Sequence, residues 1–210
     1  MKIHIIKGKF LILTMKFKFK KCMLIPISMI LTALLVFAIC YEQTPVAHNE
    51  RLWDIKKETL TVESDDWYDI FSVIYPAVNE RFPEYSFYEA GGRLKKIKDD
   101  DLWGVDHNTF VAIFGNPFMV AGCIEAFVVN DTVKFKYQDG PWVGTRYMSP
   151  FVLCDLTRAV ELVQEKVDIC PENNWAILSF SLDDIEPKWS IESTNETYTV
   201  GAYSLDVDAD

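Results

Sequence analysis

Histidine is scarce in this chain, and the scarcity restricts the catalytic chemistry available to it. Only three histidines occur among 210 residues, and only His107 lies in the part that we expect to fold. A Ser–His or Cys–His catalytic pair would depend on this one side chain. Its neighbours Asp106 and Asn108 are typical of a polar turn, so we predict a structural role for His107 and no catalytic residues.

The cysteines are also few, and their spacing fits no metal or redox site. Cys22 and Cys40 lie in the N-terminal apolar region, which leaves Cys123, Cys154 and Cys170 for the folded part. No Cys-x-x-Cys pair and no Cys/His group is present, so we predict no metal site. We expect these three cysteines to be mostly buried free thiols.

Glycine-rich nucleotide-binding patterns are missing as well. Gly91-Gly92 precedes several basic residues, but neither a Walker pattern nor a dinucleotide-binding pattern surrounds it. We therefore interpret Gly91-Gly92 as a turn and predict no cofactor.

Acidic residues are absent before Glu42, whereas lysines are frequent in that region. Four lysines between residues 16 and 21 precede an apolar run over 23–39. A basic segment followed by an apolar segment is typical of an export signal, whose positive end stays in the cytoplasm. We therefore expect the chain after Cys40 to be exported to the cell envelope, on its periplasmic or its outer-surface side.

The end of the apolar run, Phe37-Ala38-Ile39-Cys40, resembles the lipobox of bacterial lipoproteins. The resemblance implies that Cys40 is the lipidation site and that a lipid holds the protein on a membrane. An uncleaved signal anchor is the alternative, because the 17 residues of the run would form a helix of roughly 26 Å, against a bilayer core of about 30 Å. Met15 precedes a better-shaped basic segment than Met1, so either residue is a candidate start.

The exported part is strongly acidic. Seven of the 21 basic residues and none of the 31 acidic residues lie in 1–40, which leaves the remainder with a formal charge of −17. Such a surface repels nucleic acid, which we exclude as a partner. Aromatic residues make up 14% of the chain, so we expect a real core rather than a disordered segment.

Two segments have the hydrophobic spacing of amphipathic helices, 66–80 and 155–167. Each has an Asp that suits an N-cap, Asp65 or Asp66 for the first and Asp155 for the second. Apolar residues lie one, four, five, seven, eight and twelve positions after Asp66 and after Asp155. Each ends near a Pro-Glu pair and precedes a strand-like run, 85–90 or 175–182. We interpret the two as an internal repeat, although amphipathic helices also converge on such spacing because each must bury one stripe. The side chains expected in the core are Phe71, Ile74, Val160 and Val163.

Strand-like runs follow both helices, and Asn130-Asp131 suits a tight hairpin between 123–129 and 133–137. The second helix precedes further alternating runs at 188–193 and 197–203. We predict an α+β fold of two helix-on-antiparallel-sheet units. The expected order is a signal peptide or membrane anchor (1–40), a polar tether (41–64), a first unit (65–150) and a second unit (151–210).

Part of the second unit resembles a known family. A Leu-Thr-Arg-Ala-Val-Glu-Leu helix begins at Leu156, a Lys-Trp-Ser-Ile-Glu strand begins at Lys188, and a third segment runs from Tyr198 to Ala209. With these features, 155–207 is similar to the PepSY domain of exported bacterial proteins. The resemblance implies a small helix-on-sheet module. Some members of that family are associated with protease inhibition or intramolecular chaperoning, and others are lipoproteins of unknown role.

The candidate binding site lies in 141–151. This segment combines residue types that are enriched at protein interfaces with Gly and Pro residues that keep it irregular and at the surface. The alternative is that its aromatic side chains cover the core between the two units. The predicted binding residues are Trp142, Arg146, Tyr147 and Met148.

We therefore expect an exported, membrane-anchored, non-enzymatic protein that binds a protein or peptide partner. Two alternatives stay open: an envelope hydrolase that uses acids such as Asp101 and Asp106, or a purely structural envelope lipoprotein. The run Asp99-Asp100-Asp101, together with Asp106, has oxygen ligands for a cation such as Ca²⁺. Its spacing fits no EF-hand loop, so we interpret it as a solvated loop.

Overall fold

The computed structural model divides the chain into two units, 1–43 and 44–210, and each is described by itself. In the first unit, residues 30–36 are helical and have exposed apolar side chains. Within the described ranges, no helix has both the length and the apolar character needed to cross a membrane. Cys40 lies outside the described residues, so its lipidation stays a prediction. The residues that the structure describes are 30–36, 45–97, 102–117, 122–193 and 196–209.

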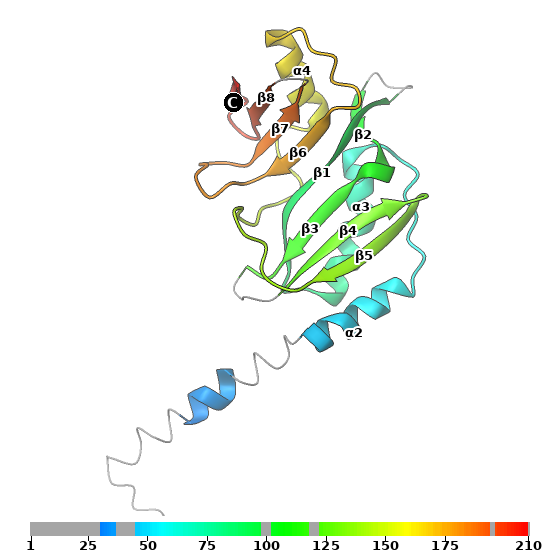
Figure 1. The fold of residues 1–210 in the computed structure, drawn as a ribbon, viewed down its shortest axis with the longest axis vertical. Coiled ribbons are helices and arrows are strands. Elements are labelled where there is room, and N and C mark those ends of the chain that lie inside the picture. The colour runs from blue at the N-terminus through cyan, green and yellow to red at the C-terminus, as the bar shows by residue number, and fades with distance from the viewer. Residues whose placement is uncertain (1–29, 37–44, 98–101, 118–121, 194–195, 210) are drawn as a thin grey trace, which may run out of the picture. The chain divides into compact units, whose positions relative to one another are not determined.

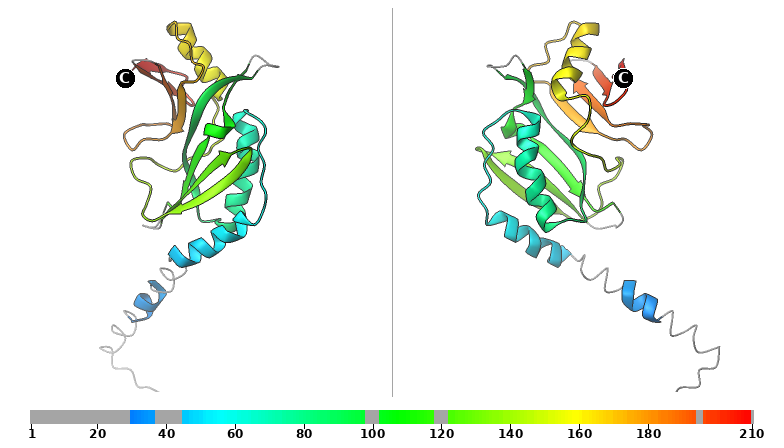
Figure 2. Two further views of the ribbon diagram at one scale, coloured as in Figure 1. Left: turned by 45° about the vertical axis from the view of Figure 1, so that its right-hand side comes forward. Right: turned by 180° about the vertical axis from the view of Figure 1, so that it is seen from behind.

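The two predicted helices are present, and each begins at the expected Asp. The Asp66 carboxylate accepts hydrogen bonds from the N–H groups at the start of α3 (Trp67–Arg81), and Asp155 does the same for α4 (Leu156–Lys166). Both helices contribute to one hydrophobic core on the same face of a sheet (Figure 2). All four side chains expected in the core are fully buried: Phe71, Ile74, Val160 and Val163.

The strands form one antiparallel sheet, which confirms the α+β class. In the described part of the chain, nine strands pair in the order β5-β4-β3-β1-β6-β7-β8-β9, with β2 on the far end of β1 (Figure 1). A short 3₁₀ helix, η2 (His107–Thr109), connects β2 and β3. The strands are β1 (Ser86–Ile97), β2 (Leu102–Val105), β3 (Val111–Gly115), β4 (Cys123–Val129), β5 (Thr132–Gln138), β6 (Trp175–Ser179), β7 (Lys188–Glu192), β8 (Thr197–Gly201) and β9 (Val207–Ala209).

β1 joins the two predicted units into one sheet. Ala90 of β1 faces Ala112 of β3 on one side and Leu178 of β6 on the other. The cores are continuous too, because the rings of Trp67 and Trp189 meet edge to face with their centroids 4.7 Å apart. The strands of 65–150 and those of 151–210 therefore share a sheet and a core.

Gly91 and Gly92 lie inside β1, so the predicted turn is wrong. A Cβ atom at Gly91 would lie 2.6 Å from the carbonyl oxygen of Ala176 and 2.9 Å from Cγ1 of Ile177. Both neighbours belong to β6, whose pairing with β1 connects the two halves of the sheet. Glycine is needed at Gly91 because two strands approach closely there, and not because the chain turns.

The predicted tether, 41–64, is largely part of the folded unit. α2 (Pro45–Lys56) lies beside β5 and buries Leu52 and Ile55 in the core. Beyond it, the N–H of Val62 donates to the carbonyl of Asp131 over 2.8 Å, so the chain continues along the edge of β5. The few apolar residues of this segment are widely spaced among charged residues. Three of them are nevertheless buried: Leu52, Ile55 and Val62.

Candidate functional site

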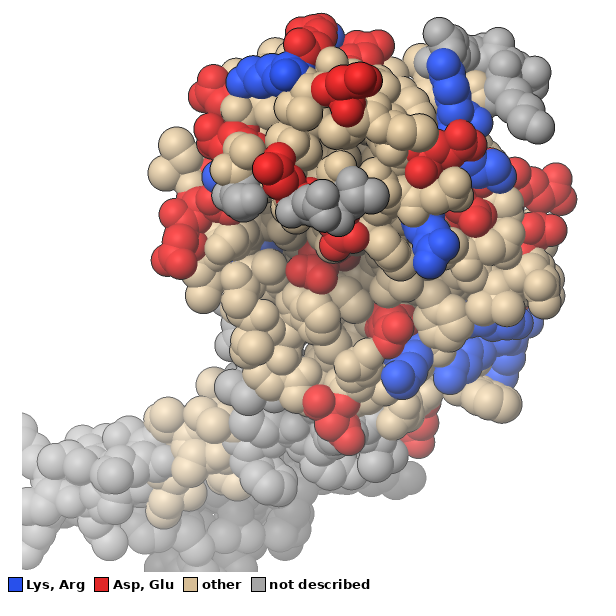
Figure 3. Space-filling view, turned by 45° about the horizontal axis from the view of Figure 1, so that its top comes forward, with Lys and Arg blue, Asp and Glu red and all other residues tan. Residues whose placement is uncertain are grey.

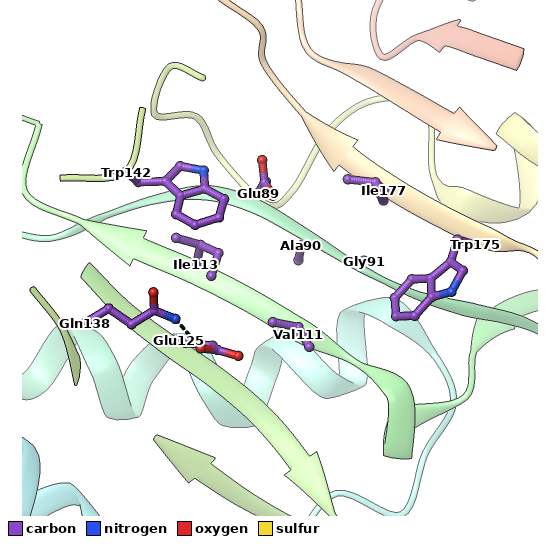
Figure 4. A pocket seen from close by; sticks show the side chains of 10 residues that line it. All are labelled: Glu89, Ala90, Gly91, Val111, Ile113, Glu125, Gln138, Trp142, Trp175 and Ile177. Atoms are coloured by element: carbon purple, nitrogen blue, oxygen red, sulfur yellow. Dashed lines mark hydrogen bonds between the residues drawn. The ribbon is translucent and has the colours of Figure 1, made fainter. Parts of the chain in front are cut away.

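A groove lies on the face of the sheet opposite α3. Figures 1 and 2 show that α3 lies against the other face. In the described ranges no helix covers this face at β1, β3 and β4, where a hollow of about 220 Å³ opens between side chains. We call this hollow the open-face groove. Its floor is apolar and is formed by Ala90, Gly91, Val111, Ile113 and Ile177 (Figure 4).

Strand pairing places two carboxylates on the groove. Glu89 of β1 faces Ile113 of β3, which in turn faces Glu125 of β4. Direct cross-strand neighbours project from the same face, so both acids flank Ile113. With strands about 4.8 Å apart, the two Cα atoms are separated by roughly 10 Å. A register shift between Phe87 and Glu89 makes room for Tyr88 as an extra residue, which adds to the apolar surface beside the groove.

Trp142 forms one end of the groove and packs against a small apolar cluster that contains Ile113 and Cys123. Its indole N–H is buried. Figure 4 shows the indole ring beside Glu89. Burial raises the pKa of the Glu89 carboxyl, and a hydrogen bond from the indole of Trp142 opposes part of that rise.

The two carboxylates differ in their partners. Glu125 accepts a hydrogen bond from the Gln138 amide and has the ammonium of Lys136 at 3.7 Å. Glu89 has no ion pair with any residue that the structure describes. The groove therefore contains one acid with partners and one half-buried acid without a cation.

The opposite end of the groove is formed by Trp175 of β6 (Figure 4). Trp175 pairs with Arg93, which lies four residues along β1 from Glu89. At about 3.3 Å per residue, the span from the Glu89 row to the Trp175 row is roughly 13 Å, the length of four extended residues.

The structure brings only one of the four predicted binding residues, Trp142, to the groove. Met148 is half-buried, and its N–H donates to the carbonyl of Phe87 over 2.8 Å. The guanidinium of Arg146 lies 5.0 Å from the centre of the Phe180 ring. Tyr147 is 52% exposed. The segment 141–151 therefore supplies one residue that lines the groove.

Exposed apolar side chains lie near this segment. Val143 and Leu182 are both exposed, and the N–H of Leu182 donates to the carbonyl of Gly144 over 3.3 Å. Ile185, in the connection between β6 and β7, is 94% exposed. This part of the surface is apolar enough for a partner to contact, although it lies outside the groove.

His107 is held between two carboxylates. Its Nδ1 lies 2.6 Å from Asp65 and its Nε2 lies 2.8 Å from Asp131, while Lys95 forms an ion pair with Asp65. Burial lowers the pKa of His107, but the hydrogen bonds to Asp131 and Asp65 outweigh it, and the net pKa is raised. These contacts tie the start of α3, η2 and the β4–β5 turn together, which supports a structural role.

The same residues are the nearest arrangement to a cation site in the described part of the chain. Ligand atoms of Asp65, Asp106 and His107 lie within 4.8 Å of one another. Both ring nitrogens of His107 and one oxygen of Asp65 already have charged partners. The ring nitrogens of His107 and the carboxylate of Asp65 are therefore already engaged within the cluster. The run 99–101, considered above as a cation site, lies outside the described residues.

A second buried histidine, His48, was missed because it lies in the predicted tether. Its Nδ1 is 2.9 Å from the hydroxyl of Tyr137, and its ring stacks on the Tyr137 ring. The Nε2 atom of His48 is buried, with no hydrogen-bond partner among the described residues. Burial lowers the pKa of His48, so the structure favours its neutral form.

Comparisons with known proteins add little to this geometry. No protein-family model matches the sequence, and no curated protein matches it. A similar solved structure is the crystal structure of a protein described as a "putative lipoprotein" from Clostridium difficile 630. It shares 10% identity and a TM-score of 0.42, and the match covers 67% of this chain and 92% of that one. A likeness this distant leaves the function to be argued from the residues of the chain itself.

Proposed function

We propose that this chain is an exported, membrane-anchored, non-enzymatic protein of the cell envelope that binds a peptide segment of a protein partner in the open-face groove. The observation that carries the proposal is the open-face groove itself, which has an apolar floor, a tryptophan at each end and the half-buried carboxyl of Glu89 on its lining.

Export and anchoring follow from the N-terminal sequence. The basic segment and the apolar run over 23–39 suit an export signal, with a lipid on Cys40 or an uncleaved helix as the anchor.

A peptide suits the dimensions and chemistry of the groove. Its apolar floor accommodates small apolar side chains, and its length of about four extended residues matches a short strand. Tryptophan is also the residue type most often found at the energetic centre of protein interfaces, and the groove has one at each end.

The test is a peptide array probed with the full chain in detergent. We expect a set of extended peptides to be retained, Trp142→Ala to lose that set, and Trp142→Phe to weaken it because the ring remains without its N–H. Tyr147→Ala is the matched control, since Tyr147 belongs to the same segment but lies outside the groove. Unchanged retention by Trp142→Ala, or no retained peptide at all, would show that the groove is not the binding site.

A second candidate function rests on the two carboxylates. Glu89 has a raised pKa and lies across Ile113 from Glu125, an arrangement in which one acid donates a proton and the other stays ionised. Of the acids named from sequence, Asp106 lies in the His107 cluster and Asp101 lies outside the described residues. Turnover of a glycan, peptide or ester by the full chain, abolished by Glu89→Gln, would favour a hydrolase over a binding protein.

A further inference from the structure

We infer that the open-face groove selects a peptide with a basic side chain, Lys or Arg, and that Glu89 is the residue that pairs with it. The inference rests on the proposed function and names the chemistry of its ligand. It starts from the position of Glu89, which is half-buried on the groove and has no cationic partner among the described residues.

A carboxylate in this position has lost part of its hydration and has gained no ion pair in return. Burial disfavours the charged form, and the pKa of Glu89 is raised even though a hydrogen bond from Trp142 opposes the rise. A ligand cation would supply the missing partner inside a groove that excludes much of the water. Charge pairing is stronger there than on an open surface.

The neighbouring charges do not fill this role. On one side, Glu125 is two strands away and already has Gln138 and Lys136 as partners. On the other side, Ser179 faces Glu89, and Lys188 faces Ser179. Lys188 is itself paired with Asp184 at 2.9 Å. Glu89 is therefore the carboxylate of the groove that remains for a ligand.

The rest of the site suits a long basic side chain. The aliphatic part of Lys or Arg packs on apolar surface while its charged end stays near polar groups, and Trp142 offers an aromatic face beside Glu89. The acidic exported part also attracts basic ligands at a distance. Figure 3 shows one end of the folded unit, where acidic side chains are spread over the surface with basic ones among them.

Three pentapeptides with blocked ends test the inference: acetyl-Ala-Val-Lys-Val-Ala-amide and its versions with norleucine or Glu at the centre. Titration calorimetry with the full chain in detergent measures each affinity. We expect the Lys peptide to bind at least about tenfold more tightly than the norleucine peptide, and the Glu peptide to bind most weakly. Glu89→Gln should remove the difference between Lys and norleucine. Glu165→Gln, an exposed acid on α4 and so on the other face of the sheet, should preserve it.

The outcomes separate the two claims. Equal binding of the Lys and norleucine peptides, unchanged by Glu89→Gln, would overturn the inference and leave peptide binding in place. A preference for Lys that survives Glu89→Gln would also overturn it, because another acid would then be responsible. No binding by any of the three peptides to a protein that melts cooperatively would contradict both claims. Gln has nearly the shape of Glu, and a melting curve of Glu89→Gln confirms that the variant is folded.

Discussion

A sheet and core shared by both halves of the folded unit predict a single unfolding transition. Ile74 lies on α3 and Val160 on α4, and both are fully buried in the same core cluster. Two independent modules would instead unfold separately, so truncating each side chain in turn distinguishes the two arrangements.

The magnitude follows from the atoms removed. Ile74→Ala deletes three carbon atoms and Val160→Ala deletes two, at about 0.8 kcal/mol each for lost burial, and each leaves a cavity with a further penalty. We expect losses of roughly 3 kcal/mol for Ile74→Ala and roughly 2 kcal/mol for Val160→Ala in the free energy of unfolding. For a folded unit of this size, these losses correspond to falls in Tm of roughly 10 °C and 6 °C.

The assay is calorimetric and spectroscopic melting of the full chain in detergent. Both variants should shift the same transition, and Asn79→Ala, at an exposed position on α3, should leave it nearly unchanged. Two transitions, each moved by only one of the core variants, would refute the shared core. A loss below about 0.5 kcal/mol for Ile74→Ala would show that α3 is not packed on the sheet as described.

Two further predictions concern the His107 cluster and the β1–β6 pairing. Because the folded-state pKa of His107 is raised, its protonation stabilises the fold fully below pH about 6.5, and this contribution is lost as pH rises through the folded-state pKa. His107→Gln should therefore lower Tm more at pH 5.5 than at pH 9, and an equal fall at both would contradict the pairing with Asp65 and Asp131. Gly91→Ala should destabilise the unit by about 1–3 kcal/mol, because its Cβ would overlap the Ala176 carbonyl. A denaturation midpoint equal to that of the parent chain would refute this close approach.

Local signals in the sequence were enough to predict the helices and the hairpin. Asp66 and Asp155 cap the two helices through backbone N–H groups within their own first turn, so the sequence around each contains all the partners. Asn130 and Asp131 have φ values of 48° and 59°, the left-handed conformation that a tight hairpin turn requires and that these residue types tolerate.

Contacts between distant segments were not predictable in the same way. The pairing of β1 with β6 joins residues more than 80 positions apart, and its signature, Gly91-Gly92, has the composition of a turn. α2 was missed because Leu52 and Ile55 are isolated apolar residues, and their burial depends on β5. Neither feature can be recognised without knowing which strands are neighbours.

The groove residues also differ in whether a local sequence signal or a contact between distant segments places them. Trp142 was named from sequence because a large aromatic residue in an irregular segment is itself a signal of a binding surface. Glu89 and Glu125 gave no such signal, since each alternates with buried residues along its strand as a solvated acid would. They share a site only because β3 separates β1 from β4, and that strand order is a property of the whole sheet.

The position of Trp142 depends on its own loop. Gly140 and Gly144, on either side of it, have φ values of 95° and 96°, a conformation that residues with a Cβ rarely adopt. Neither glycine has a neighbour within 4 Å of its would-be Cβ atom, so the need for glycine comes from the backbone turn and not from crowding. Strand alternation thus places Glu89 on the groove, and two turns place the indole beside it. The ligand contacts that we propose require both, so a change in either the sheet or the loop is expected to affect binding.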